Sequence, residues 1–241
     1  MAKDLAQIYE ENQRFNAIAS FLHGTRYRNL LEVAAGISPR DGERLHVLDI
    51  GCGPGKAFAV LNEHLPIQYT GVDVNQGFVR LAAERYGDQN NFEVIEADIQ
   101  EHIAKLANYD LVMGLESFEH IPEPLVVKLV EAIGASDFQR LYVTVPNELG
   151  PALAIKNVGS FLMGYERWKE YSWRETFFAS VYNLDRVGVH GVEHKGFDWR
   201  WLAQTLRQNV NITHTYGSPF AWMPRFISPS IGFVCAKRTQ A

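Results

Sequence analysis

The residues Val47 to Gly55 (VLDIGCGPG) join an apolar run to three closely spaced glycines, which are Gly51, Gly53 and Gly55. The run Val47 to Ile50 has strand character, and the glycines allow a sharp turn against which a ligand can lie directly. Pro54 suits the first turn of a helix, because its missing N–H would have no partner there. A strand, a glycine turn and a helix N-terminus form the nucleotide-binding corner of a doubly wound sheet. We expect Asp49 to orient this turn rather than to react.

Two acidic residues follow later strand-like segments and can serve the same ligand. Asp73 lies about twenty residues past the glycine turn, where a carboxylate accepts hydrogen bonds from both ribose hydroxyls. Asp98 follows the next strand-like segment, where a short acceptor can meet an adenine amino group. The third glycine of the dinucleotide fingerprint would fall at Lys56 and is absent, which argues against NAD.

Strand and helix patterns alternate along the chain, which predicts an α/β fold with a parallel sheet and helices on both faces. Helical apolar spacing over residues 4–35 predicts two N-terminal helices, with a break around Gly24. The expected strands are 45–50, 67–73, 92–96, 109–114, 138–146, 210–217 and 231–236. The expected helices are 54–65, 76–86, 100–107, 122–134 and 198–208.

The domain organisation predicted from these patterns is a single domain over residues 1–241. It comprises a helical cap (1–40), a ligand-binding core (45–146), an insertion (147–197) and the C-terminal part of the sheet (198–241). The insertion interrupts the βα rhythm and is long for a compact domain, so we expect it to cover a substrate.

Composition limits the classes of partner that the protein can bind. Its 241 residues carry a formal net charge of −5, and basic and acidic residues balance in the aromatic-rich insertion, which disfavours nucleic acid as a partner. No apolar run is long enough for a transmembrane segment. The two cysteines, Cys52 and Cys235, have no metal-site spacing, which favours a cytoplasmic location. The oligomeric state stays open.

The phrase D-x-G-x-G-x-G in VLDIGCGPG resembles the first motif of class I S-adenosylmethionine (SAM) methyltransferases. This resemblance implies a seven-stranded, mostly parallel Rossmann-like sheet with SAM as the cofactor. One of the helical arginines in HGTRYRNLL, Arg26 or Arg28, could pair with the methionyl carboxylate of SAM, and Arg28 is the one included in the predicted site. The implied cofactor-binding residues are Asp49, Gly51, Cys52, Gly53, Gly55, Asp73, Val74, Asp98, Ile99, Leu115 and Arg28.

The phrase GLESFEHIPEP places Glu116, Glu119 and His120 at i, i+3 and i+4, so a helical turn would put them on one face. It is similar to the ubiquinone-type O-methyltransferases and to the small-RNA 3′-end 2′-O-methyltransferases. In the latter, E-x-x-E-H and a later histidine hold a divalent metal. The later phrase HGVEHKGFDW continues the similarity and implies His194 as the fourth ligand, although one extra residue precedes its aromatic position.

A metal at Glu116, Glu119, His120 and His194 would make a weakly acidic hydroxyl easier to deprotonate. His120 or Glu119 would then take the proton as the catalytic base. Mixed carboxylate and imidazole ligands suit Mg, Mn, Fe or Zn. The alternative is that Glu119 and His120 form only a structural loop beside SAM, without a metal.

The sequence therefore predicts a SAM-dependent methyltransferase that acts on a hydroxyl of a small molecule. A sugar or glycan precursor or a catechol would suit a metal-assisted reaction. Two alternatives remain open: an RNA 2′-O-methyltransferase and a SAM-binding protein without catalysis.

Overall fold

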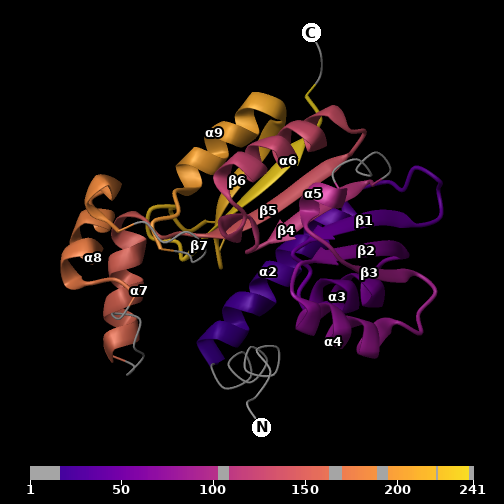
Figure 1. Cartoon of the computed structure of the whole chain (residues 1–241), viewed down its shortest axis with the longest axis horizontal. Helices are drawn as coiled ribbons and strands as arrows, with labels where there is room; N and C mark the ends of the chain where they lie inside the picture. Colours follow the sequence, from indigo (N-terminus) through magenta and orange to yellow (C-terminus); the bar gives the residue numbers. More distant parts are fainter. Residues whose placement is uncertain (1–16, 103–108, 163–169, 189–194, 221, 239–241) are drawn as a thin grey trace.

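The computed structural model describes residues 17–102, 109–162, 170–188, 195–220 and 222–238. These residues form a seven-stranded sheet in the order β3-β2-β1-β4-β5-β7-β6 (Figure 1). Pairing is parallel from β3 to β5, whereas β7 runs antiparallel to both β5 and β6. The strands are β1 (Leu45–Ile50), β2 (Ile67–Asp73), β3 (Phe92–Glu96), β4 (Leu111–Leu115), β5 (Arg140–Pro146), β6 (Asn211–Ser218) and β7 (Ser230–Ala236).

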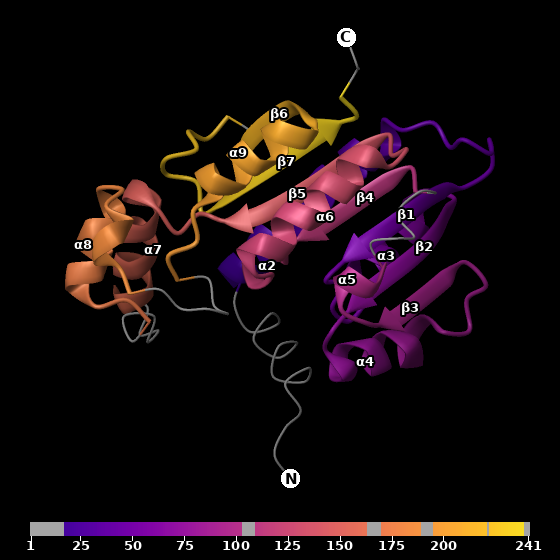
Figure 2. The same ribbon diagram turned by 45° about the horizontal axis from the view of Figure 1, so that its top comes forward.

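Helices cover both faces of this sheet (Figures 1 and 2). The helices are α2 (Ala17–Ala35), α3 (Lys56–His64), α4 (Gln76–Tyr86), α5 (Ile99–His102), α6 (Glu123–Ala135), α7 (Gly150–Leu162), α8 (Trp173–Ser180) and α9 (Trp199–Asn209), with the 3₁₀ turns η2 (Phe118–His120) and η4 (Leu184–Arg186). The predicted α/β fold with a mostly parallel sheet is confirmed. Every strand that was expected from the sequence is present, with bounds shifted by two residues or fewer.

The central strands are buried on both sides because successive side chains point to opposite faces. In β1, Val47 packs in the core under α2 and α3, and its neighbour Leu48 packs in the core under α6 and α9. Both side chains are fully buried. Two hydrophobic layers therefore hold the sheet rigidly, so that the carboxyl ends of its parallel strands form a fixed edge.

The insertion after β5 forms the helical pair α7 and α8, which lies beyond the end of β5 (Figures 1 and 2). The pair has a small core of its own, in which Leu153 of α7 packs with Tyr171, Ala179 and Val187. Inside it, the Asn157 amide donates a 2.8 Å hydrogen bond to Thr176 Oγ1. A covering role for residues 147–197 stays a prediction, as does the proposed division into four parts.

The expected helix break at Gly24 is wrong. Helix α2 runs without interruption from Ala17 to Ala35 and includes Gly24, which is exposed. One glycine inside a helix costs only about 1 kcal/mol relative to alanine, and the burial of Leu30 and Ala34 against α3 offsets that cost. Within the described ranges, none of the helices is long and apolar enough to cross a membrane.

Two helical glycines should respond in opposite ways to alanine. A Cβ at Gly24 would meet nothing within 4 Å, whereas a Cβ at Gly134 in α6 would lie 2.8 Å from the Asn209 carbonyl oxygen at the end of α9. We expect Gly24→Ala to raise the free energy of unfolding by about 0.5–1 kcal/mol, and Gly134→Ala to lower it by about 1–3 kcal/mol. Urea unfolding of both variants tests this, and equal shifts would contradict the packing of α6 on α9.

Candidate functional site

The glycine turn after β1 requires backbone angles that only glycine adopts without strain. Gly51, Gly53 and Gly55 all have positive φ, at 73°, 53° and 78°. A Cβ at Gly51 would lie 2.5 Å from Ser117 Cβ. The Gly51 N–H donates to the Val72 carbonyl at 2.8 Å, which fixes the turn against β2. The turn therefore brings bare backbone to the carboxyl edge of the sheet.

Asp73 ties this turn to the next strand. Its Oδ2 accepts a 2.8 Å hydrogen bond from the Gly53 N–H, and its Oδ1 accepts one of 2.8 Å from the Asn75 N–H. Burial raises the pKa of Asp73, and the two backbone hydrogen bonds oppose that shift. Each carboxylate oxygen keeps a second lone pair. Asp73 can therefore accept two further donors that approach from the cavity beside it.

That cavity has a volume of about 500 Å³, which is in the range of small-molecule and cofactor sites. The predicted cofactor residues that line it are Gly51, Gly53, Asp73, Val74, Asp98, Ile99 and Leu115. Its apolar wall also includes Phe78, Ile121, Pro122 and Leu125, which sequence reasoning missed. These four lie at the starts of α4 and α6, so their approach depends on how the helices pack. Ser117 Oγ, buried at the cavity wall, has no hydrogen-bond partner among the described residues.

Three of the predicted residues stand behind the cavity rather than in its wall. The Cys52 side chain packs against Gly71, in the space that a Cβ at Gly71 would need. Burial raises the pKa of the Cys52 thiol well above its usual value. Gly55 precedes α3 beside the Tyr86 ring. Asp49 is fully buried, and the Tyr69 hydroxyl donates a 2.6 Å hydrogen bond to its Oδ2. These residues shape the turn and do not face the cavity.

Burial also dominates the electrostatics of Asp49. It raises the pKa of this carboxyl to about 7, with a smaller contribution from the negative charge of Asp73 and an opposing one from Tyr69. Asp49 Oδ1 has no hydrogen-bond partner within the described part of the chain. Burial therefore extends the pH range over which Asp49 holds its proton.

The arginine that faces the site is Arg26 and not Arg28. Arg28 is exposed on α2, because two residues along a helix turn a side chain to the other side. The Arg26 guanidinium lies 3.3 Å from Glu116 Oε1, and the same oxygen accepts a 2.7 Å hydrogen bond from the Ser230 hydroxyl. Arg26, Glu116 and Ser230 thus connect α2, the end of β4 and the start of β7.

The segment after β4 does not form the helical turn that the spacing predicted. Glu116 has a positive φ of 54°, which is uncommon for a residue with a side chain, and only the 3₁₀ turn η2 follows. The Glu119 side chain is completely buried, whereas that of His120 is 43% exposed and lines the cavity. His120 Nε2 lies 4.0 Å from Glu119 Oε1. This distance is too long for a hydrogen bond, so the buried carboxylate acts on the imidazole through its charge.

The described residues contain only part of the predicted metal centre, which stays a prediction. Glu116 Oε1 contacts the Arg26 guanidinium and accepts a hydrogen bond from the Ser230 hydroxyl. Among the described residues, no group of three or more His, Cys, Asp or Glu side chains could hold a metal ion. His194 lies outside the described residues, so its role as a ligand stays a prediction.

Comparisons with known proteins agree with this geometry. A family model described as a methyltransferase domain matches residues 47–135. The ubiquinone biosynthesis O-methyltransferase of Coxiella burnetii is 32% identical over 80 residues, which are 33% of this chain and 34% of that protein. The chain thus aligns with about a third of the length of this relative.

Two solved structures share the fold at 16% identity. The magnesium protoporphyrin IX methyltransferase of Synechocystis PCC 6803 with bound SAH has a TM-score of 0.57, with 92% of this chain and 88% of the other covered. The methyltransferase domain of bacterial CtHen1 has a TM-score of 0.59, with 89% and 99% covered. The structural similarity therefore extends well beyond residues 47–135.

Replacing Asp73 should weaken binding of S-adenosylhomocysteine (SAH), the demethylated product of SAM. Asp73→Asn leaves one acceptor oxygen where two are needed, and a hydrogen bond to a charged group contributes about 1.5–3 kcal/mol. We expect an affinity loss of about tenfold or more by isothermal titration calorimetry. The exposed Asp88→Asn is the matched control, and urea unfolding checks that both variants fold. Unchanged SAH affinity in Asp73→Asn would contradict the site.

The raised pKa of Asp49 predicts a specific pH dependence of stability. Between the usual carboxyl pKa and about 7, the folded state holds a proton that the unfolded state has lost, so this group's contribution to stability falls as pH rises through that window. Asp49→Asn stays neutral and lacks this fall. Urea unfolding at pH 5, 6, 7 and 8 should show that the free energy of unfolding of the variant rises with pH relative to that of the unmodified chain. A difference that is constant with pH would contradict the shift.

Proposed function

We propose, from the membership of this chain in the class I SAM-dependent methyltransferases, that it transfers the methyl group of SAM to a hydroxyl of a small molecule. The observation that carries this proposal is the cavity at the carboxyl edge of the sheet. It joins Asp73, the glycine turn and His120 in one space. Ligands of doubly wound folds bind at this edge.

The residues present fit the adenosyl part of SAM. Asp73 would accept hydrogen bonds from the two ribose hydroxyls, and Asp98 would accept one from the adenine amino group. The apolar side chains of Phe78, Ile99 and Leu125 would enclose the purine. The buried Ser117 hydroxyl, which has no hydrogen-bond partner among the described residues, offers a further polar contact at the wall.

His120 is the proposed catalytic base. SAM supplies a methyl group activated by the positive sulfonium, and the acceptor oxygen must lose its proton as the new bond forms. The half-exposed imidazole of His120 lines the cavity and can take that proton. Glu119, buried behind it, would favour the ring orientation that keeps Nε2 or Nδ1 available.

An O-methyl product and a small acceptor are supported by two observations. The ubiquinone biosynthesis O-methyltransferase of Coxiella burnetii is 32% identical to this chain over 80 residues. The net charge of −5 disfavours a long polyanion as the acceptor. The proposal does not depend on metal assistance, which stays a prediction from the sequence.

The experiment that tests this proposal separates catalysis from cofactor binding. His120→Gln should lower turnover about 10²–10⁴-fold, the usual contribution of a general base, while SAH affinity stays within about twofold. SAH release from SAM, followed with a panel of hydroxylated sugars and catechols, gives the turnover. The matched control is His64→Gln on α3, since His64 is not among the residues that line the cavity.

Three outcomes would contradict the proposal. Full turnover in His120→Gln would remove His120 from the reaction. Turnover with oligoribonucleotides and none with small hydroxyl compounds would favour the RNA methyltransferase. SAH binding without turnover on either class of acceptor would favour a SAM-binding protein that lacks catalysis.

A further inference from the structure

Outside the cofactor cavity, a groove lies between α9, the edge strand β6 and the segment that joins β6 to β7. Two adjoining cavities of about 410 and 520 Å³ form it, and both are lined by Arg207, Pro224 and Arg225. The first continues along β6, and the second continues along α9 to Arg200 and Tyr182. Because they share these three residues, the two cavities lie next to each other.

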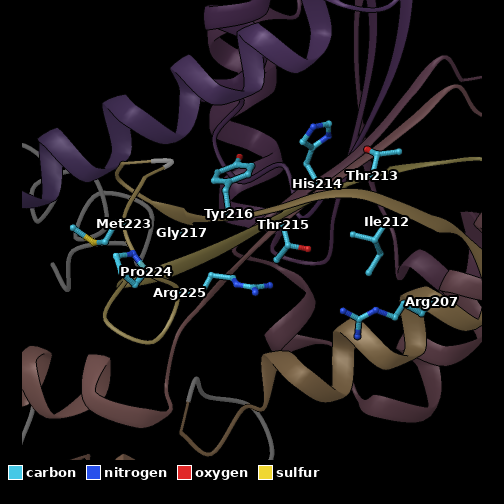
Figure 3. Close-up of a pocket in the computed structure, with 10 residues that line it drawn as sticks. All are labelled: Arg207, Ile212, Thr213, His214, Thr215, Tyr216, Gly217, Met223, Pro224 and Arg225. Carbon is cyan, nitrogen blue, oxygen red and sulfur yellow. The ribbon is translucent and has the colours of Figure 1, made fainter.

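The groove is positively charged, although the chain as a whole has a net charge of −5. Arg207 and Arg225 are exposed, and their guanidinium groups point towards one another across the groove (Figure 3). In the described part of the chain, no ion pair or hydrogen bond engages either guanidinium, and no acidic residue lines either cavity. Like charges that face one another repel, and an anion between them removes that repulsion.

Arg200 sets the other end of the groove. It lies two turns before Arg207 on α9. Its Nε donates to Asp198 Oδ1 and its Nη2 to Asp198 Oδ2, and its Cζ lies 5.0 Å from the centroid of the Tyr182 ring. Its charge is therefore neutralised, unlike those of Arg207 and Arg225. The uncompensated positive charge is therefore at Arg207 and Arg225, the two arginines that line both cavities.

The chemistry of these groups selects the ligand. A guanidinium presents parallel N–H donors that match the oxygens of a phosphate. Two guanidinium groups can therefore bind two phosphate groups, or together bind all the oxygens of one. The Thr215 side chain points into the same space and adds a hydroxyl (Figure 3). The cavity volumes suit a small molecule. We infer that this groove binds a small phosphorylated molecule, with Arg207 and Arg225 holding its phosphate groups.

The groove is connected to the cofactor cavity through a short series of contacts. Gly217 lines the groove, and the next residue, Ser218, pairs with Ser230 at the start of β7. Ser230 donates to Glu116, which lines the cofactor cavity. Phosphate binding itself does not depend on methyl transfer.

Pyrophosphate is the probe for this site, titrated by calorimetry at constant ionic strength. We expect saturable binding at one site per chain, weakened about tenfold or more in the double variant Arg207→Gln and Arg225→Gln, because each lost contact is a charged hydrogen bond. Arg44→Gln, an exposed arginine at the start of β1, is the control for loss of positive charge. Urea unfolding checks that the double variant folds, and SAH titration of the same samples tests the proposed function separately.

Several results would overturn the inference. Absence of saturable pyrophosphate binding would do so, as would equal binding by the double variant and the Arg44→Gln control. Binding of a single-stranded oligoribonucleotide that depends on Arg207 and Arg225, without binding of pyrophosphate, would replace the small molecule by RNA. A chain that binds pyrophosphate in this way but fails to bind SAH would contradict the proposed function and support the groove.

Discussion

The carboxylate of Asp73 is the contact on which the cofactor site depends. It accepts the backbone N–H of Gly53 on one oxygen and that of Asn75 on the other, so one side chain joins the glycine turn to the segment that begins α4. The position of Asp73 is fixed by β2, which pairs with β1 in parallel and in register up to Ile50 and Val72. A carboxylate placed in this way holds two loops and still faces the cavity.

The order of the strands brings the remaining parts of the site to the same edge. Glu116 follows β4, and β7 runs antiparallel to β5, so Ser230 at its start reaches the carboxyl end of the parallel strands. Arg26, which lies on α2, reaches the Glu116 carboxylate. Glu116 adopts a positive φ while these two residues hold its side chain, and the backbone strain is stabilised by the surrounding contacts.

The sequence predicted the features that depend on local sequence patterns. Strand runs, the glycine turn and Asp73 depend on neighbours within a few residues, and all of them lie where expected. The ion pair of Arg26 with Glu116 joins residues far apart in the chain, and no local signal distinguishes Arg26 from Arg28. The same holds for the groove, where Arg207 and Arg225 meet only because β6 and β7 place their connecting segment beside α9. The predicted helix break at Gly24 was wrong because the packing of α2 outweighed the weak helix propensity of glycine.

The two carboxyls near the turn are linked through charge. Burial raises the pKa of both Asp49 and Asp73, and the negative charge of Asp73 is one of the causes of the shift at Asp49. Hydroxyl donors from a ribose would favour the ionised form of Asp73, as any hydrogen bond to a carboxylate does. A more fully ionised Asp73 holds Asp49 more firmly in its protonated form. The turn would then carry one negative charge, on Asp73, which faces the cavity. Asp49, buried behind it, would stay neutral, so that the cost of a second desolvated charge is avoided.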